Sequence, residues 1–279
     1  MAGQEYRQAS LRIWDEMAAG WEGHRSRVWD ASRAVGEWMV DALDPQPGET
    51  VLELAAGVGD TGFAAARRLG ASGRLITTDF SEQMVHAARR RADELGVSNA
   101  EFRTLDAERM DLDDGSVDGV LCRWGYMLMA DPAAALTETR RVLGEGGRVA
   151  LSVWGGPQRN PWASIPARAL LELTGAEPPD PLAAGIFAMA SEERTRELLG
   201  AAGFEPRRVE TVEMEWSFES LADYWHHLTD VKGAIAMVVR ALPETEQDAL
   251  GEELARRLEP YAEGHGYRLP GMCLNVLAA

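Results

Sequence analysis

The sequence predicts an α/β fold: a doubly wound, Rossmann-like sheet of seven mostly parallel strands, with N-terminal helices and helical lid insertions. Two observations support this prediction. Between residues 48 and 154, short apolar segments of strand length alternate with segments of helical periodicity. A glycine-rich turn follows the first apolar segment. Strands joined by helices form parallel sheets with right-handed crossovers, so we expect helices on both faces of the sheet.

Composition and charge narrow the class of protein. The 279 residues include 28 Lys and Arg against 45 Asp and Glu, which gives a formal net charge of −17. A protein held on nucleic acid or on an anionic membrane needs a basic face, so we expect neither partner. Hydrophobic residues (46%) and charged residues (26%) occur at ordinary globular frequencies. No apolar run is long enough to span a membrane, and we expect a soluble, cytoplasmic protein, with homodimer formation left open.

Two residue types are scarce. The two cysteines, Cys122 and Cys273, lie far apart in the sequence and predict reduced thiols rather than a disulfide or a metal site. Of the 28 basic residues, Lys232 alone is a lysine. Lysine-dependent chemistry is therefore excluded from most of the chain.

The first 47 residues are expected to form a helical cap. Large apolar residues recur at helical spacing in residues 4–43, and two helices account for them. The segment Asp44-Pro-Gln-Pro-Gly48 ends the second helix, because two prolines and a glycine cannot continue it.

Residues 48–154 are expected to form the core of the fold, with five strands and three helices. We place the strands at residues 50–55, 74–78, 101–105, 117–122 and 148–153, and the helices at residues 60–69, 81–95 and 132–143. Ser81 is a natural N-cap for the second of these helices, since its hydroxyl can accept a backbone N–H.

The chain beyond residue 154 is expected to add helices and to complete the sheet. Residues 207–218 and 267–277 alternate like strands, and residues 221–261 are helical throughout in their apolar spacing. We therefore divide this part into a helical insertion at 155–190 and a sheet-completing segment at 191–279, with a helical lid at 219–262.

The turn Gly57-Val-Gly59-Asp-Thr-Gly62 follows the first predicted strand and opens a helix, so the G-x-G-x-x-G pattern occurs in its required context. Glycines allow a ligand to approach the backbone beyond the carboxyl ends of the strands. The pattern alone does not separate a nicotinamide enzyme from a binder of S-adenosylmethionine, and a plain strand-to-helix turn also fits it.

Acidic residues near the turn favour one of these ligands. Glu53 lies four residues before Gly57, where a carboxylate attracts a cationic amino-acid group and repels a pyrophosphate. Asp79 ends the second predicted strand, where a short acid can accept both ribose hydroxyls. Asp106 follows the third strand and can accept an adenine amine.

Four motifs occur in order between residues 48 and 154. They are Val51-Leu-Glu-Leu-Ala-Ala-Gly-Val-Gly-Asp60, Thr78-Asp-Phe-Ser-Glu-Gln-Met-Val85, Asp106-Ala-Glu108, and Gly115-Ser-Val-Asp118 with Arg140-Arg-Val-Leu-Gly-Glu-Gly-Gly-Arg148. Together they resemble the class I S-adenosylmethionine-dependent methyltransferases, and among these the type 11 group similar to the ubiquinone and menaquinone biosynthesis enzymes. The resemblance implies S-adenosylmethionine as cofactor and S-adenosylhomocysteine as its product.

The resemblance implies roles for individual positions. The first motif contributes Glu53, Ala55, Gly57 and Gly59; Asp79 binds the ribose, Phe80 and Met84 flank the adenine, and Asp106 with Ala107 reads the adenine edge. Ala55 departs from the pattern, because many members carry a glycine there. An alanine fits if its φ angle stays negative.

Methyl transfer is an in-line displacement, so the enzyme mainly holds acceptor and methyl group together in a dry site. A general base is needed only if the acceptor must lose a proton early. The sequence therefore assigns no catalytic residue and offers four candidates: His24, Arg123, Tyr126 and His227.

Two of these candidates, Arg123 and Tyr126, are chosen for their position at the end of a strand. Arg123, Trp124 and Tyr126 follow the fourth strand, whose carboxyl end faces the cofactor in this fold. We expect Arg123 and Trp124 to contact the cofactor, and Trp124 and Tyr126 to line the acceptor site. Two alternatives stay open: Trp124 as a packing residue, and Arg123 paired with a surface acid.

The histidine candidates lie outside the core. His24 belongs to helices that commonly close the site in this family, although a structural histidine fits equally. His226 and His227 point about 100° apart on a helix, so at most one faces the pocket. No third ligand is spaced with them, and we expect no metal.

The sequence thus predicts an S-adenosylmethionine-dependent methyltransferase that modifies an O or C atom of a small, partly apolar acceptor. A quinone, a phenol or a secondary metabolite fits this class. Two alternatives remain: a methyltransferase-like fold that binds the cofactor without methyl transfer, and an NAD(P)-dependent reductase. The reductase is disfavoured because no tyrosine precedes Lys232 by four residues; position 228 is leucine.

Overall fold

The computed structural model describes residues 2–279. Ten α-helices are described: α1 (Ala2–Gly23), α2 (Arg25–Leu43), α3 (Asp60–Leu69), α4 (Glu82–Leu95), α5 (Pro132–Val142), α6 (Pro161–Thr174), α7 (Glu192–Ala201), α8 (Leu221–Val231), α9 (Ala234–Ala241) and α10 (Glu244–Leu258). Three short 3₁₀ helices join them: η1 (Tyr126–Leu128), η2 (Pro157–Arg159) and η3 (Glu259–Tyr261).

The strands form one mixed sheet, and this confirms the predicted fold class. They are β1 (Thr50–Glu53), β2 (Arg74–Asp79), β3 (Ala100–Thr104), β4 (Val117–Arg123), β5 (Leu143–Trp154), β6 (Pro206–Phe218), β7 (Ala262–Glu263) and β8 (Gly266–Ala278). Seven strands follow the order β3-β2-β1-β4-β5-β8-β6, and the two-residue β7 pairs with β8 alone. The first five are parallel, whereas β8 runs antiparallel to both β5 and β6. The carboxyl ends of the five parallel strands, β1 to β5, therefore lie at one edge of the sheet.

The central strands are apolar because helices cover the sheet. Val51 and Leu52 of β1, and Val120 and Leu121 of β4, are fully buried. The amphipathic helix α2 lies across β4, β5, β6 and β8, and α4 packs on β2 and β3. A continuous run of buried apolar residues is expected for parallel strands covered on both faces.

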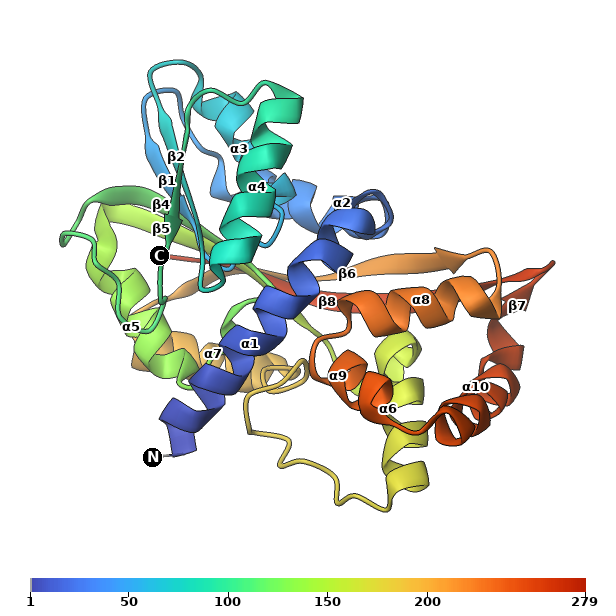
Figure 1. The fold of residues 1–279 in the computed structure, drawn as a ribbon. Coiled ribbons are helices and arrows are strands. Elements are labelled where there is room, and N and C mark those ends of the chain that lie inside the picture. Colours follow the sequence, from blue (N-terminus) through green and yellow to red (C-terminus); the bar gives the residue numbers. More distant parts are fainter. Residues whose placement is uncertain (1) are drawn as a thin grey trace.

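The strands β6 and β8 are longer than their neighbours and project to the right in Figure 1; α6 packs on β8 and α8 on β6, while α9 and α10 pack on α8 and α6. They pair from Pro206 with Ala278 to Phe218 with Tyr267. The lid segment, residues 219–262, thus starts and ends at the far tip of this ribbon.

The prediction of continuous helix over residues 221–261 is wrong, because the segment contains three helices. The first break lies at Lys232 and Gly233, where Gly233 has a φ of 54° that favours glycine. The second lies at Leu242 and Pro243, because a proline cannot continue the hydrogen-bond ladder of the preceding helix. Apolar residues keep their helical spacing across both breaks, so the spacing alone did not reveal where the helices end.

The N-terminal helix α1 packs between α4 and α8. Trp21 Nε1 donates to the carbonyl of Val231 at 3.1 Å. The approach is closest at Gly20, where a β-carbon would lie 2.1 Å from the carbonyl oxygen of Asp230. The cap therefore contacts the lid segment directly.

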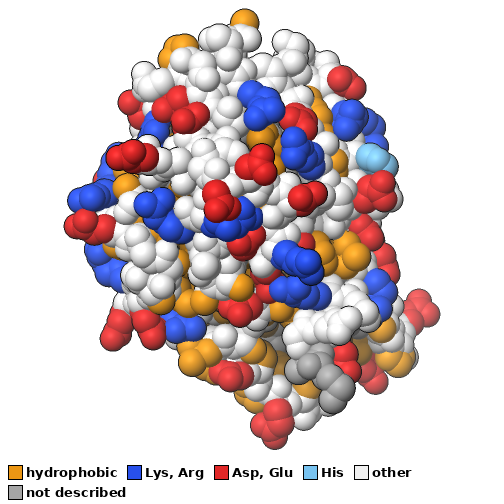
Figure 2. Space-filling view, turned by 90° about the vertical axis from the view of Figure 1, so that its left-hand side faces the viewer, with side chains coloured by type: hydrophobic (Ala, Val, Ile, Leu, Met, Phe, Trp, Pro, Cys, Tyr) orange, Lys and Arg blue, Asp and Glu red, His pale blue; other side chains and the backbone are white. Residues whose placement is uncertain are grey.

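The surface carries both charges. On the face drawn in Figure 2, basic and acidic side chains alternate, so this face has no continuous basic area that would attract nucleic acid. No helix within residues 2–279 combines the length and the apolar character needed to cross a membrane.

Gly20→Ala tests the contact between α1 and α8. The added methyl group must push two backbones apart, so we expect the free energy of unfolding in urea to fall by about 1–3 kcal/mol. Gly23→Ala is the matched control, because nothing lies within 4 Å of its β-carbon. Equal stability of the two variants would contradict the close approach.

Candidate functional site

The loop between β1 and α3 is built from left-handed backbone. Gly57 and Gly59 have φ angles of 56° and 85°, and Gly59 forms the N-cap of α3. A β-carbon at Gly59 would lie 2.5 Å from the ring of Phe63. Both conformation and space therefore require glycine here.

Ala55 differs from the expectation of a negative φ, because its φ is 49°. Its methyl group lies against Gly125, where a β-carbon would meet it at 2.6 Å. Trp124, at the end of β4, is also left-handed, with a φ of 62°. A non-glycine residue in this region costs of order 1–3 kcal/mol, and such strain concentrates at functional sites.

Glu53 is a buried carboxyl beside the loop. Its Oε1 accepts a hydrogen bond from the Gly62 N–H at 2.7 Å, and its Oε2 has no partner among residues 2–279. Burial raises the pKa of Glu53 to about 8, against the lowering effects of the Gly62 N–H and the Arg123 guanidinium. A cationic ligand group would satisfy the unpartnered oxygen and would restore the carboxylate.

Asp79 ends β2 on the other side of the loop. Its two carboxyl oxygens accept hydrogen bonds from the N–H groups of Gly57 and Ser81, each at 2.9 Å. Burial raises the pKa of Asp79 to about 6. Phe80 follows, partly exposed, whereas Met84 is buried in a cluster with Met17 of α1.

Helix α1 contacts the residues that follow β3. Arg7 pairs with Asp106 at 3.3 Å and also with Glu108. Glu108 in turn accepts the N–H of Ala130 at 2.9 Å, while Ala107 is buried beside it. After the neighbouring strand β2, the Ser81 hydroxyl donates a hydrogen bond to Asp15 of α1 at 2.6 Å. The N-terminal helix thus bonds to the strand ends that the sequence analysis assigned to ribose and adenine.

Arg123 lies inside the site and has no surface acid as partner among the ion pairs of residues 2–279. It donates to the hydroxyls of Thr61 at 2.9 Å and Ser32 at 3.0 Å, and stacks 4.4 Å from the Trp124 ring. Burial lowers its pKa, although Asp60 and Glu53 oppose this. The guanidinium therefore adds positive charge at the start of α3.

Tyr126 is a core residue in this structure, which does not support its prediction as a catalytic or pocket-lining residue. The side chain is fully buried, and its hydroxyl shares a hydrogen bond of 2.7 Å with Thr139 of α5. Cys122 is fully buried too, and burial raises its pKa to about 12. It packs as a small apolar group.

Four indole rings form a row from the end of β4 into the helical insertions. The ring centroids are 4.1 Å apart for Trp124 and Trp154, 4.5 Å for Trp154 and Trp162, and 5.3 Å for Trp162 and Trp216. All four rings are buried. This indole row joins the strand-end edge to the lid segment.

The two histidine candidates meet at the far end of this row. Their ring centroids are 5.3 Å apart, and His24 Nε2 lies 3.1 Å from an oxygen of Asp230. His227 is fully buried 5.1 Å from the Trp216 ring, and neither ring nitrogen has a partner among the described residues. Burial and nearby cations lower its pKa, which keeps the imidazole neutral. His226 is exposed, as the helical spacing required of one of the pair.

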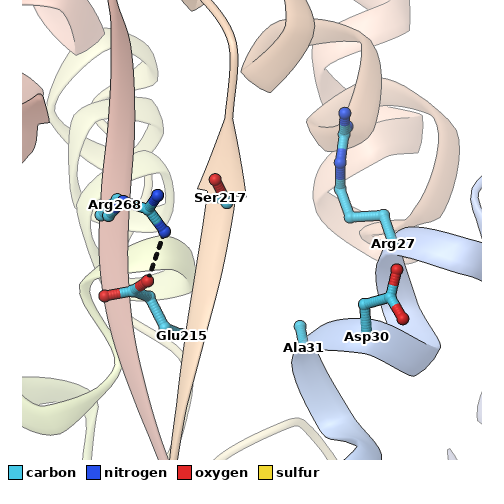
Figure 3. A pocket seen from close by; sticks show the side chains of 6 residues that line it. All are labelled: Arg27, Asp30, Ala31, Glu215, Ser217 and Arg268. Atoms are coloured by element: carbon cyan, nitrogen blue, oxygen red, sulfur yellow. Dashed lines mark hydrogen bonds and ion pairs between the residues drawn. The ribbon is translucent and has the colours of Figure 1, made fainter. Parts of the chain in front are cut away.

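A separate groove of about 530 Å³ lies between α2 and strands β6 and β8 (Figure 3). Within it Arg268 is bonded to Glu215 at 2.8 Å, whereas Arg27 and Asp30 pair with Asp223 and Arg33 outside the groove. Because strand side chains alternate, Glu215 and Ser217 face this groove while Trp216 faces α8. The groove therefore does not open onto the indole row.

Sequence reasoning missed three residues in this region. Arg7 and Glu108 join the cap to the core; Glu108 belongs to a quoted motif, but nothing in the sequence pairs it with Arg7. Lys232 places its amine 3.8 Å from the Trp162 ring centroid and 4.4 Å from that of Trp216. Its uniqueness as a lysine was the available signal. No group of three His, Cys, Asp or Glu side chains within residues 2–279 is arranged to hold a metal ion.

Acids at the ends of β1, β2 and β3 lie beside a left-handed glycine loop, which is the arrangement that Rossmann-like sheets use to bind nucleoside cofactors. A sequence family described as "Methyltransferase domain" matches residues 45–163. The chain carries a class I S-adenosylmethionine-dependent methyltransferase domain, distantly related to the ubiquinone and menaquinone biosynthesis methyltransferases.

Individual relatives match the chain over part of their length. An uncharacterised 37.1 kDa protein of a Streptomyces fradiae transposon is 41% identical over 122 residues, 44% of this chain and 35% of that protein. Demethylmenaquinone methyltransferase of Clavibacter sepedonicus is 38% identical over 117 residues, 42% of this chain and 45% of that protein. The chain thus matches less than half the length of each.

The fold also resembles solved structures. A SAM-dependent methyltransferase from Aquifex aeolicus superposes with a TM-score of 0.51 at 21% identity, over 67% of this chain and 90% of that one. At this identity the likeness concerns the fold.

Glu53→Gln tests the buried carboxyl in the cofactor-free protein. Because folding raises the pKa of Glu53 from 4.5 to about 8, the folded state keeps a proton that the unfolded state loses. The resulting stability is complete below pH 4.5 and is lost as the pH rises through about 8. Relative to the variant, wild type should lose about 1–2 kcal/mol of unfolding free energy between roughly pH 6.5 and 8 in urea titrations. Glu82→Gln, an exposed change, should run parallel to wild type; parallel curves for Glu53→Gln would exclude a protonated Glu53.

Proposed function

We propose that this protein transfers the methyl group of S-adenosylmethionine to an O or C atom of a small, partly apolar acceptor. The observation that carries the proposal is the joining of two features at one sheet edge. The glycine loop and its acids suit the cofactor, and the indole row leads from that edge into the lid segment.

The buried polar groups fit S-adenosylmethionine. Glu53 offers an unpartnered carboxyl oxygen to the cationic amino group of the methionine part, and Arg123 lies close enough to complement its carboxylate. Asp79 and Asp106 lie at successive strand ends, where they would take the ribose and the adenine edge. Phe80, Ala107 and the loop glycines would complete this part of the site, with Met84 supporting it from below. When bound, the cofactor supplies an electrophilic methyl group.

The chain's own contribution is to hold the acceptor and to exclude water. Helix α1 bonds to the second and third strand ends through Asp15 and Arg7, and Gly20 packs it on α8. Such closure brings reactants to near-attack distance, which can supply several kcal/mol of the barrier reduction. We propose that residues 1–47 and 219–262 close the site over a cofactor-binding core at 48–154.

The acceptor side is apolar and enclosed. The indole row is a buried stack of aromatic rings, and His24 with His227 offers an imidazole pair near its end. His24, hydrogen-bonded to Asp230, is the better placed of the two to accept a proton, because His227 is held neutral and unpartnered. Quinones, phenols and aromatic secondary metabolites match these surroundings.

Calorimetric titration tests cofactor choice. We expect micromolar binding of S-adenosylmethionine and S-adenosylhomocysteine and no binding of NADH. Asp79→Ala should weaken both affinities by roughly ten- to hundredfold, because it removes a charged hydrogen-bond acceptor. Asp93→Ala, an exposed change on α4, is the matched control.

A second arm tests turnover. Incubation with S-adenosylmethionine and a panel of phenols, quinones and aromatic acids should release S-adenosylhomocysteine with at least one acceptor. Binding of NADH alone would sink the methyltransferase proposal. Tight cofactor binding without product from any acceptor would favour a cofactor-binding protein that does not transfer methyl groups.

A further inference from the structure

Lys232 is an unusual cation because aromatic rings, and no acid, surround its amine. The amine lies over the faces of Trp162 and Trp216, at 3.8 Å and 4.4 Å from their centroids. No ion pair within residues 2–279 involves Lys232. Asp230 and Asp223, the acids of the same helix, are already paired with His24 and Arg27. The amine has no counter-ion among residues 2–279.

The neighbouring polar groups also lack acceptors. Trp216 Nε1 is a buried donor with no partner among the described residues, although the residue is only 2% exposed. Both ring nitrogens of His227, whose ring centroid lies 5.1 Å from that of Trp216, are buried and unpartnered as well. Each unpaired buried polar group costs about 1–3 kcal/mol. Trp216 Nε1, on the ring that the Lys232 amine overlies, is an unpaired donor that a negatively charged ligand group would satisfy.

The backbone holds the lysine in this position. Lys232 is the C-cap of α8, and Gly233, with a φ of 54°, turns the chain into α9. The residue as a whole keeps part of its solvent exposure. Desolvation by the rings lowers the pKa of Lys232 well below its ordinary value.

We infer that Lys232, with Trp162 and Trp216, anchors the carboxylate of an aromatic acid, which is the acceptor class of this enzyme. The flat indole faces fit aromatic rings, and the amine with the Trp216 N–H supplies donors for the carboxylate oxygens. A carboxylic acid is ionised at neutral pH, whereas an ordinary phenol is not, so the carboxylate is the better counter-ion. This inference deepens the proposed function and rests on it.

The binding step balances in charge. An ionised acid meets a protonated Lys232, and the two form an ion pair in a site of low dielectric constant. If the amine is neutral, it takes up a proton from the solvent as the carboxylate binds, and the same pair results. A partly desolvated ion pair of this kind is stabilised most when both charges are present together.

Binding of matched probes tests this inference. The probes are 1-hydroxy-2-naphthoate and 1-hydroxy-2-naphthamide, which share their rings and differ in charge, titrated in the presence of S-adenosylhomocysteine and followed by tryptophan fluorescence. Wild type should bind the acid at least tenfold more tightly than the amide. Lys232→Met, in which the side chain still packs on aromatic faces, should bind acid and amide equally. Arg194→Met on α7 is the control and should behave like wild type.

A thermal measurement covers the case of a variant that misfolds. Because Lys232→Met removes an uncompensated buried amine, its cofactor-free melting temperature should equal or exceed that of wild type by a few degrees. A lower melting temperature, equal binding of acid and amide by wild type, or no binding of either probe would each overturn the anchor. Loss of S-adenosylhomocysteine binding would instead overturn the proposed function.

Discussion

The hydrogen bond between the Gly62 N–H and the Glu53 carboxyl fixes the arrangement on which the site depends. It joins the end of β1 to the first turn of α3, and the 2.7 Å distance leaves no space for a β-carbon at Gly62. The loop between these two residues must then turn within a few residues, which requires left-handed backbone at Ala55, Gly57 and Gly59. The loop geometry thus forces the Glu53 carboxyl to be buried, which is unfavourable for its charged form. A cationic ligand group would offset this cost.

The cap and the lid segment depend on this core for their position. Helix α1 contacts strand ends through Asp15 and Arg7 and contacts α8 through Gly20, so it connects the cofactor side to the acceptor side. The indole row makes the same connection inside the protein, from Trp124 to Trp216. Because packed elements transmit strain, these two connections allow a structural change at the strand ends to displace α8.

The sequence predicted the elements whose signals are local. Apolar segments between turn residues located β1 to β5, and Ser81 marked the start of α4, where its hydroxyl accepts the Met84 N–H at 3.1 Å. Contacts between distant residues were not predictable: Arg7 and Asp106 are 99 residues apart, and neither carries a pattern that names the other. The burial of Tyr126 against Thr139 was missed for the same reason, because a strand-end position does not say which way a side chain points.

The strand order also has a consequence for the growing polypeptide. The last strand, β8, lies between β5 and β6, so β6 has no place in the sheet until residues 266–278 have left the ribosome. The parallel half can form first, since its five strands are complete at residue 154. Until β8 is synthesised, one edge of β5 has no hydrogen-bonded neighbour, and the segment from residue 155 onward cannot join the sheet. Nascent chains in that interval carry an exposed apolar edge of the kind that recruits chaperones.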